Sequence, residues 1–196
     1  IAEAGINHNG QMDIALELVA RAKEAGADCI KFQAFRTDNS ESRHAGMPGY
    51  FSGRVEGMNK REWSRSIEFA PKPFRILKQR CESMGIAFLA TACDIGGLHI
   101  LEEVGVDAIK VASSDTNNDY LLTAVGRTGL PVILSTGMSM LSEVSHAVAV
   151  LEESGSGEIA VMQCTSQYPA PYEEINLGVM ETFRSVFGRP VGLSDH

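Results

Sequence analysis

One six-residue pattern occurs twice in this chain, and its two copies lie 79 positions apart. The copies are Gly26-Ala27-Asp28-Cys29-Ile30-Lys31 and Gly105-Val106-Asp107-Ala108-Ile109-Lys110. Each copy ends a short apolar run on a lysine, and an apolar residue follows, Phe32 or Val111. The pattern predicts two equivalent strands of a repeating α/β fold. Because burying an unpaired ammonium costs several kcal/mol, two matched lysines indicate a shared anionic ligand.

Short apolar runs alternate with helical patterns along the chain. Strands are predicted at Ile1–Ala4, Cys29–Gln33, Ala87–Thr91, Ala108–Ser113, Pro131–Ser135, Ile159–Gln163 and Val191–Ser194. Helices are predicted at Met12–Glu24, Pro73–Met84, Gly97–Glu103, Asp119–Arg127, Leu141–Glu153 and Leu177–Phe187. A glycine stands between several helices and the next strand, where it supplies the left-handed residue that ends a helix: Gly26, Gly85, Gly105 and Gly129.

The strands are nearly continuous apolar runs, which is typical of parallel strands covered on both faces. Seven strands alternating with helices predict an α/β fold, a (β/α)8 TIM barrel that is incomplete at the C-terminus, as one domain over residues 1–196. A doubly wound sheet is the structural alternative. We prefer the barrel because no GxGxxG turn follows the first strand and polar residues stand at the strand ends.

Composition restricts the class of protein. A hydrophobic content of 44% and a net charge of −8 indicate a globular protein that does not bind nucleic acid. No apolar run approaches the roughly 20 residues that span a bilayer, so no membrane role is expected. The four cysteines lack CxxC spacing, which predicts free thiols and a cytoplasmic location. Because the chain begins inside an apolar segment without a methionine, its natural N-terminus is expected further upstream.

The connection over residues 34–72 interrupts the alternation and shows no clear period. It holds a mixture of charged and aromatic residues: Arg36, Asp38, Tyr50, Phe51, Arg54 and Trp63. A loop of this length in a compact domain is typical of a lid over a site, with a locally disordered insertion as the alternative.

Polar side chains collect at the ends of the predicted strands, which meet at the active site of a barrel. They are Glu3, Lys31, Gln33, Thr91, Lys110, Ser113, Asp115, Ser135, Thr165, Ser194, Asp195 and His196. Lysines neutralise phosphate and carboxylate groups and hydroxyls hydrogen-bond their oxygens, so this set suits a phosphorylated, carboxylated substrate. Taken singly, each lysine could be a surface side chain, each serine an ordinary strand-end hydroxyl, and His196 a lone polar residue.

Six motifs, in this order, resemble the sialic acid synthase family, which also includes legionaminate and pseudaminate synthases. The motifs are IAEAGINHNG (1–10), GADCIKFQ (26–33), KVASSDTNN (110–118), PVILSTGM (131–138), QCTSQYPAP (163–171) and VGLSDH (191–196). The resemblance implies a metal-dependent transferase that condenses phosphoenolpyruvate with an N-acetylated aldose, such as N-acetylmannosamine. The product is a nine-carbon 2-keto acid, and phosphate is released. The resemblance also implies a homodimer and a divalent metal that polarises the aldehyde, with manganese expected and magnesium as the alternative.

The resemblance also implies roles for individual residues. The catalytic group would be Asp115, Glu3, Lys31 and Lys110, with Asp115 standing where some relatives have glutamate. Oxygens of phosphoenolpyruvate would be bound by Lys31, Lys110, Thr91, Ser113, Ser135, Ser166 and Ser194. The sugar side would be lined by Glu3, Gln33 and Tyr168. His196 matches a metal-binding histidine, and the second metal ligand and a C-terminal antifreeze-like domain are expected beyond it.

Two other functions remain open at this point. A Schiff-base aldolase on the same barrel would use Lys31 or Lys110 as its nucleophile. The chain could also be a truncated fragment without activity, because a barrel that lacks its last strand leaves two unpaired edges. The motifs do not specify which sugar is the acceptor.

Overall fold

The structure is a computed structural model that describes residues 1–47 and 57–196. The chain divides into two compact units, Ile1–Val106 and Asp107–His196. Within each unit, the strands run parallel to their neighbours and helices connect them, as the sequence predicts for a repeating α/β fold.

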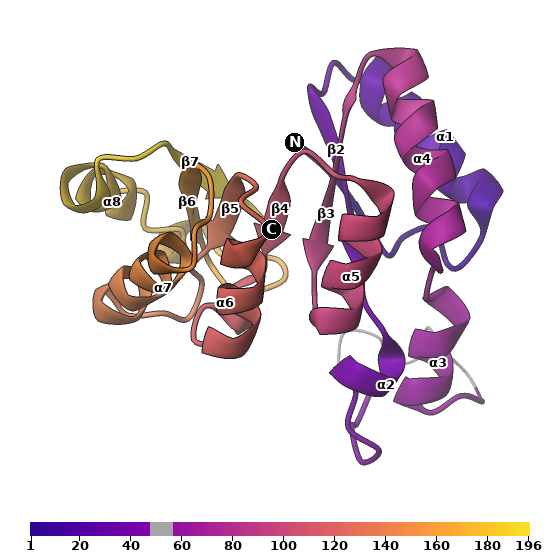
Figure 1. Cartoon of the computed structure of the whole chain (residues 1–196), viewed down its shortest axis with the longest axis horizontal. Coiled ribbons are helices and arrows are strands. Elements are labelled where there is room, and N and C mark those ends of the chain that lie inside the picture. Colours follow the sequence, from indigo (N-terminus) through magenta and orange to yellow (C-terminus); the bar gives the residue numbers. More distant parts are fainter. Residues whose placement is uncertain (48–56) are drawn as a thin grey trace. The chain divides into compact units, whose positions relative to one another are not determined.

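The described residues of the first unit form three strands in the order β1-β2-β3. The strands are β1 (Ala2–Gly5), β2 (Cys29–Ala34) and β3 (Ala87–Ala92). The helices are α1 (Met12–Glu24), α2 (Thr37–Ser40), α3 (Lys60–Ile67), α4 (Pro71–Met84) and α5 (Ile95–Val104). Helices α1, α4 and α5 pack on the strands and on one another, and Figure 1 shows them along the sheet.

The second unit contains four strands in the order β4-β5-β6-β7. The strands are β4 (Ile109–Val111), β5 (Val132–Ser135), β6 (Ile159–Cys164) and β7 (Val191–Ser194). The α-helices are α6 (Asp119–Arg127), α7 (Leu141–Glu153) and α8 (Val179–Phe187). Two short 3₁₀ helices, η2 (Ser113–Asp115) and η3 (Tyr172–Glu174), follow β4 and β6. Ser113, predicted as the end of a strand, therefore begins a 3₁₀ turn.

The predicted helix ends are confirmed at the glycines. Gly85 and Gly105 end α4 and α5 in the left-handed conformation, with φ of 64° and 72°. Gly26 and Gly129, with φ of 80° and 70°, follow the last residues of α1 and α6. A residue with a Cβ is disfavoured at these angles, which explains why glycine marks each boundary in the sequence.

Side chains on β2 alternate between two faces of the sheet. Ile30, Phe32 and Ala34 are buried in the apolar core, whereas Lys31 and Gln33 lie on the opposite face and are only partly covered. This two-residue period is the ordinary consequence of strand geometry. It separates the core of the first unit from the face that carries its polar residues.

The connection over residues 34–72 contains helices that the sequence analysis missed. Both α2 and α3 lie in it, and α4 begins at Pro71, so the predicted irregular loop is wrong for these parts. The Asn59 side chain accepts a hydrogen bond from the Glu62 N–H at 3.0 Å, and the Glu62 carboxylate accepts one from the Asn59 N–H at 2.9 Å. This capping box stabilises the first turn of α3, a helix that its apolar residues alone do not predict. Tyr50, Phe51 and Arg54, named as lid residues, lie outside the described residues.

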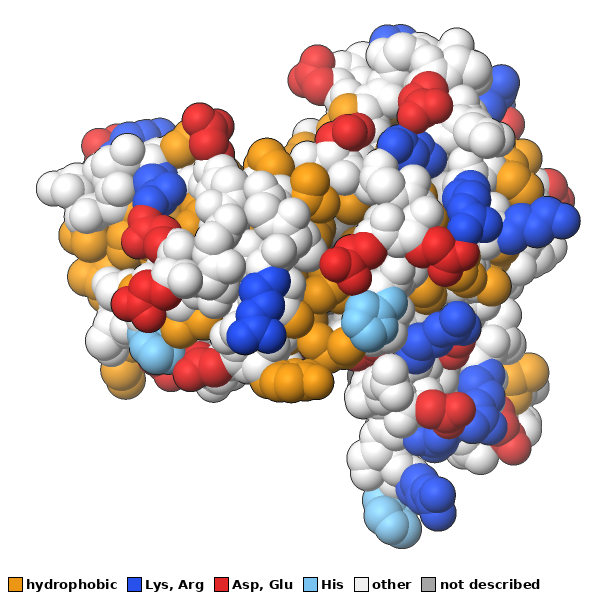
Figure 2. All heavy atoms as spheres, viewed as in Figure 1, with side chains coloured by type: hydrophobic (Ala, Val, Ile, Leu, Met, Phe, Trp, Pro, Cys, Tyr) orange, Lys and Arg blue, Asp and Glu red, His pale blue; other side chains and the backbone are white. Residues whose placement is uncertain are grey.

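Ion pairs join α2 and its flanks to α3. Asp38 pairs with Arg61 and with Arg65, Glu41 pairs with Lys60, and Arg36 pairs with Glu68 just after α3. Figure 2 shows acidic and basic side chains side by side in this part of the unit. Several linked pairs stabilise such a contact more than one isolated surface pair does.

Four free cysteines fit the predicted thiols. Burial raises the pKa of the Cys81 thiol to about 12, which makes it unreactive at neutral pH. Across the described parts of the chain, no helix is long and apolar enough to cross a membrane.

Candidate functional site

In the first unit, the Glu3 carboxylate forms an ion pair with the Lys31 ammonium. The parallel register places Glu3 on β1 directly beside Lys31 on β2, so both side chains leave the sheet on the same face. The Lys31 side chain is 15% exposed and the Glu3 side chain is 47% exposed. The lysine predicted to hold an anion is therefore paired with a carboxylate of its own chain.

Gln33 and Thr91 extend this polar face toward the ends of β2 and β3. The register pairs the two residues directly, and Thr91 is buried. Gly5 has a φ of +51°, and a Cβ placed on it would lie 2.9 Å from Glu3 Oε1 and 3.6 Å from Gln33 Nε2. The absence of a side chain at Gly5 thus leaves room for the Glu3 carboxylate beside the Gln33 amide.

In the second unit, Lys110 lies on β4 with its side chain buried. Its Nζ donates hydrogen bonds to Ser135 Oγ at 2.5 Å and to the Val111 carbonyl oxygen at 2.6 Å. Ser135 ends the neighbouring strand β5 and is also buried. Two predicted anion-binding groups are therefore in direct contact at the edge of this sheet.

Ser113 and Ser166 lie on the two sides of the loop that follows β5. The Gly137 N–H in this loop donates a hydrogen bond to Ser113 Oγ at 2.9 Å, which leaves the Ser113 hydroxyl hydrogen to be donated. The buried Thr116 hydroxyl lies 3.1 Å from the Ser113 carbonyl oxygen and 2.9 Å from the Ser135 carbonyl oxygen. Thr116 therefore ties the segment after β4 to the end of β5.

Asp115 is held by its own turn. Its Oδ1 accepts a hydrogen bond from Asn118 Nδ2 at 3.1 Å, and its Oδ2 accepts one from Ser114 Oγ at 3.2 Å. These two donors orient the Asp115 carboxylate at the end of η2. Its predicted part in catalysis stays a prediction.

His196 follows β7 and stacks on Tyr168, with ring centroids 4.2 Å apart. Its Nδ1 lies 2.9 Å from the Thr165 carbonyl oxygen. Because a carbonyl only accepts, Nδ1 carries a hydrogen, and in the neutral ring Nε2 keeps its lone pair. Ser194 ends β7 and pairs in register with Cys164, one residue before Thr165. Three predicted site residues, Tyr168, Ser194 and His196, are therefore grouped around the end of β6.

The fit of His196 to a divalent metal is incomplete. Donation of Nδ1–H to a backbone carbonyl is the arrangement that metal-ligating histidines adopt. Within residues 1–47 and 57–196, however, no three His, Cys, Asp or Glu side chains come together as a metal-binding group. The described residues thus supply one candidate ligand rather than a complete set, and we assign no chemical step to a metal.

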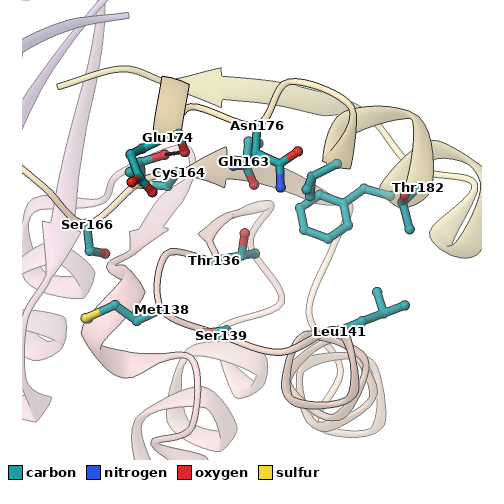
Figure 3. Close-up of a pocket in the computed structure, with 13 residues that line it drawn as sticks. Thr136, Met138, Ser139, Leu141, Gln163, Cys164, Ser166, Glu174, Asn176 and Thr182 are labelled. Atoms are coloured by element: carbon teal, nitrogen blue, oxygen red, sulfur yellow. Dashed lines mark hydrogen bonds between the residues drawn. The ribbon is translucent and has the colours of Figure 1, made fainter. Parts of the chain in front are cut away.

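A cavity of about 380 Å³ opens within the second unit, beside the ends of β5 and β6. Figure 3 shows Gln163 and Asn176 across it from Thr136, with Leu141 and Thr182 further along the wall. Of the predicted site residues, Thr165 and Ser166 line it. Among the described residues that line this cavity there is no lysine or arginine, so these residues do not provide the charge that the predicted anion requires.

Several residues that hold these loops were not predicted from the sequence. Thr116 and Gly137 are two of them. Gln163 is a third, and its Nε2 donates to the Ile175 carbonyl oxygen at 2.9 Å. Thr165, which was predicted at a strand end, donates from Oγ1 to the Glu174 carbonyl oxygen at 3.1 Å. For Thr116 and Gln163, a polar side chain near a strand end is the signal that the sequence offers.

Lys31 and Lys110 lie in different units of the chain. The hypothesis that both bind one anionic ligand therefore stays a prediction. Within each unit, the predicted residues do come together: Glu3 with Lys31, Gln33 with Thr91, and Lys110 with Ser135.

Parallel strands, connecting helices, and lysines and hydroxyls at the strand ends define an α/β protein of the barrel class. The chain belongs to the NeuB family, whose model matches residues 18–196.

Two curated relatives and one solved structure illustrate this membership. The N,N'-diacetyllegionaminic acid synthase of Legionella pneumophila is 36% identical over 100% of this chain and 56% of the relative. The human N-acetylneuraminate-9-phosphate synthase is 34% identical, over 100% of this chain and 55% of the relative. A crystal structure of N-acetylneuraminic acid synthetase from Leptospira borgpetersenii, in complex with citrate, matches with a TM-score of 0.85 and 38% identity. It covers 100% of this chain and 64% of that one.

These likenesses confirm the predicted resemblance and the predicted fold class. The chain spans little more than half the length of the curated relatives that it matches. Activity, substrates and partners of the whole protein are therefore matters for proposal.

Proposed function

We propose that this chain forms the phosphoenolpyruvate-binding part of a sialic-acid-type synthase. The enzyme would condense phosphoenolpyruvate with an N-acetylated aldose. The contact between Lys110 Nζ and Ser135 Oγ carries the proposal, because a buried ammonium bonded to a hydroxyl is suited to bind an anion. Membership of the NeuB family supports it, as do the relatives named N,N'-diacetyllegionaminic acid synthase and N-acetylneuraminate-9-phosphate synthase.

In the proposed reaction, C3 of phosphoenolpyruvate forms a bond to the aldehyde carbon of the open-chain sugar. The aldehyde oxygen takes a proton, and a water oxygen adds to C2. Phosphate then leaves with its bridging oxygen as C2 becomes a ketone. The reaction is balanced, because phosphoenolpyruvate, the aldose and one water molecule give the 2-keto acid and phosphate.

The residues have distinct proposed tasks. In the second unit, Lys110 is the proposed anion-binding ammonium, and the hydroxyls of Ser113 and Ser135 are the proposed donors to oxygens of the anion. In the first unit, Lys31 and Thr91 have the same proposed tasks. Asp115 is the proposed acceptor for the proton of the attacking water, because its carboxylate is oriented at the end of η2. The proposed anion-binding residues Ser166 and Ser194, and the sugar-side residues Glu3, Gln33 and Tyr168, complete the set.

The test measures phosphate release by the purified protein with phosphoenolpyruvate and manganese. Acceptors are N-acetylmannosamine, its 6-phosphate, and a di-N-acetylated trideoxyhexose. We expect phosphate release with one of the three, together with a stoichiometric 2-keto acid. If phosphoenolpyruvate neither binds nor releases phosphate with any acceptor, the proposal is wrong and a fragment without activity is favoured. A covalent adduct on Lys31 or Lys110 after borohydride treatment with pyruvate would instead establish a Schiff-base aldolase.

A further inference from the structure

We propose that Gly137 is a positioning residue that sets where the Ser113 and Ser166 hydroxyls stand in the anion site. The proposal rests on the proposed function, in which both hydroxyls bind phosphoenolpyruvate. Gly137 itself contributes no side chain, so it acts through its backbone N–H and through the space that its missing Cβ leaves open.

The geometry around Gly137 is tight on three sides. A Cβ on this buried residue would lie 2.3 Å from Ser166 Oγ, 3.0 Å from Ser113 Oγ and 3.2 Å from the Cys164 carbonyl oxygen. Non-bonded carbon and oxygen atoms do not approach to 2.3 Å, so the closest atom, Ser166 Oγ, has to move. Any side chain at this position must therefore displace the Ser166 hydroxyl.

The loop around Gly137 is anchored and cannot easily move away. On one side, Thr136 donates from Oγ1 to the Met162 carbonyl oxygen at 2.9 Å. On the other side, Met138 adopts a φ of 62°, a left-handed conformation that non-glycine residues seldom take. A turn held in this way gives Gly137 a defined position between the segments after β4 and β6.

The two serines respond differently to a change at Gly137. Ser113 Oγ accepts the Gly137 N–H at 2.9 Å, so it is fixed to the loop. For Ser166 Oγ, the described residues provide no hydrogen bond, so its hydroxyl is free to meet a ligand and also free to rotate away. A methyl group at Gly137 is therefore expected to remove the Ser166 hydroxyl from the site while the fold persists.

The experiment compares four proteins by calorimetric titration with phosphoenolpyruvate: wild type, Gly137→Ala, Ser166→Ala and the double variant. Loss of a hydrogen bond to a charged group costs about 1.5–3 kcal/mol, so Gly137→Ala should raise Kd roughly tenfold to a hundredfold. Because Gly137→Ala already displaces the Ser166 hydroxyl, the double variant should bind about as weakly as Gly137→Ala alone.

Gly178→Ala is the matched control. Gly178 lies in the same unit before α8, and a Cβ there would meet nothing within 4 Å. The Gly178→Ala variant should have the same Kd for phosphoenolpyruvate and the same unfolding midpoint as the wild type. Thermal unfolding without ligand separates a positioning effect from a general loss of stability.

Several outcomes would overturn the inference. One is that Gly137→Ala binds phosphoenolpyruvate with the Kd of the wild type. Another is that the binding free energies lost in Gly137→Ala and in Ser166→Ala add up in the double variant. If Gly137→Ala does not fold, the folding of the double variant tests the inference. The double variant lacks the Ser166 hydroxyl, which is the closest contact of the new Cβ, and it should therefore fold. A double variant that also fails to fold would refute the inference. If even the wild type does not bind phosphoenolpyruvate, the proposed function fails. A crystal structure of Gly137→Ala then tests the positioning role separately: an unmoved Ser166 hydroxyl overturns it, and a displaced one supports it.

Discussion

The ammonium nitrogen of Lys110 lies 2.5 Å from the hydroxyl oxygen of Ser135 on the neighbouring strand. The same nitrogen lies 2.6 Å from the Val111 carbonyl oxygen. Ser135 accepts from Lys110, so its own hydroxyl hydrogen can be donated to a ligand oxygen. A hydroxyl that accepts from a cation is a stronger donor, because neighbouring hydrogen bonds polarise one another.

Replacement of Lys110 by methionine should raise the Kd for phosphoenolpyruvate at least tenfold. The change removes a charge-assisted donor while keeping a side chain of similar length, and such donors contribute about 1.5–3 kcal/mol. Calorimetric titration measures the effect. Lys72→Met is the control, because Lys72 is exposed on α4. Unchanged affinity in Lys110→Met would remove this lysine from the anion site.

Replacement of Glu3 by glutamine should change activity far more than stability. Its carboxylate is about half exposed, and ion pairs in such positions contribute less than about 1 kcal/mol to unfolding free energy. Urea unfolding and phosphate release measure the two quantities. Glu17→Gln, which removes the exposed pair with Arg21 on α1, is the control for surface charge. A variant that is strongly destabilised yet fully active would assign Glu3 a structural role.

Acid should destabilise the protein through His8. The ring is buried and stacks on Phe69 with centroids 4.0 Å apart. Burial lowers the pKa of His8 from 6.5 to about 4. Between these two values the unfolded chain binds a proton that the folded chain does not, so stability decreases as pH falls from about 6.5 to 4.

The expected loss from His8 between pH 7 and pH 5 is about 2 kcal/mol, because each unit of pKa difference corresponds to about 1.4 kcal/mol. Urea unfolding of wild type and His8→Gln at both pH values measures it. The glutamine variant should lose less stability than the wild type over this interval. Equal losses in the two proteins would show that His8 is not the group responsible.

Substitution of His196 by alanine should weaken manganese binding. Thr165 orients the ring so that Nε2 of the neutral form offers its lone pair. Electron paramagnetic resonance of free Mn²⁺ measures binding without a need for activity. His146→Ala is the control, since His146 is exposed and pairs with Asp119. Identical binding in His196→Ala and wild type would exclude His196 as a ligand.

Much of the fold could be predicted because its signals are local. Helix α7 begins at Leu141 and ends at Glu153, as its apolar period predicts, and Gly85 and Gly105 end their helices as predicted. The helices within residues 34–72 were missed for a local reason as well. Helix α3 is short and strongly polar, and it depends on the Asn59 cap and on ion pairs with the segment 36–41 rather than on an apolar stripe.

The candidate site could be predicted as a set of residue types at strand ends, but not as a set of contacts. Nothing in the motif around Gly137 indicates that its Cβ position is filled by the Ser166 hydroxyl. Likewise, the pairing of Glu3 with Lys31 depends on the register between β1 and β2, which no single segment of sequence specifies.

Local patterns in the sequence were enough to predict the alternation of strands and helices and the matching positions of Lys31 and Lys110 on two strands. These features follow from the periodicity of apolar residues and from the glycines at helix ends, and both signals are contained within a few consecutive residues. The oxygens that each ammonium contacts, Glu3 for Lys31 and Ser135 for Lys110, are known from the folded chain alone. These partners are distant in sequence, and it is strand register and packing that bring them together.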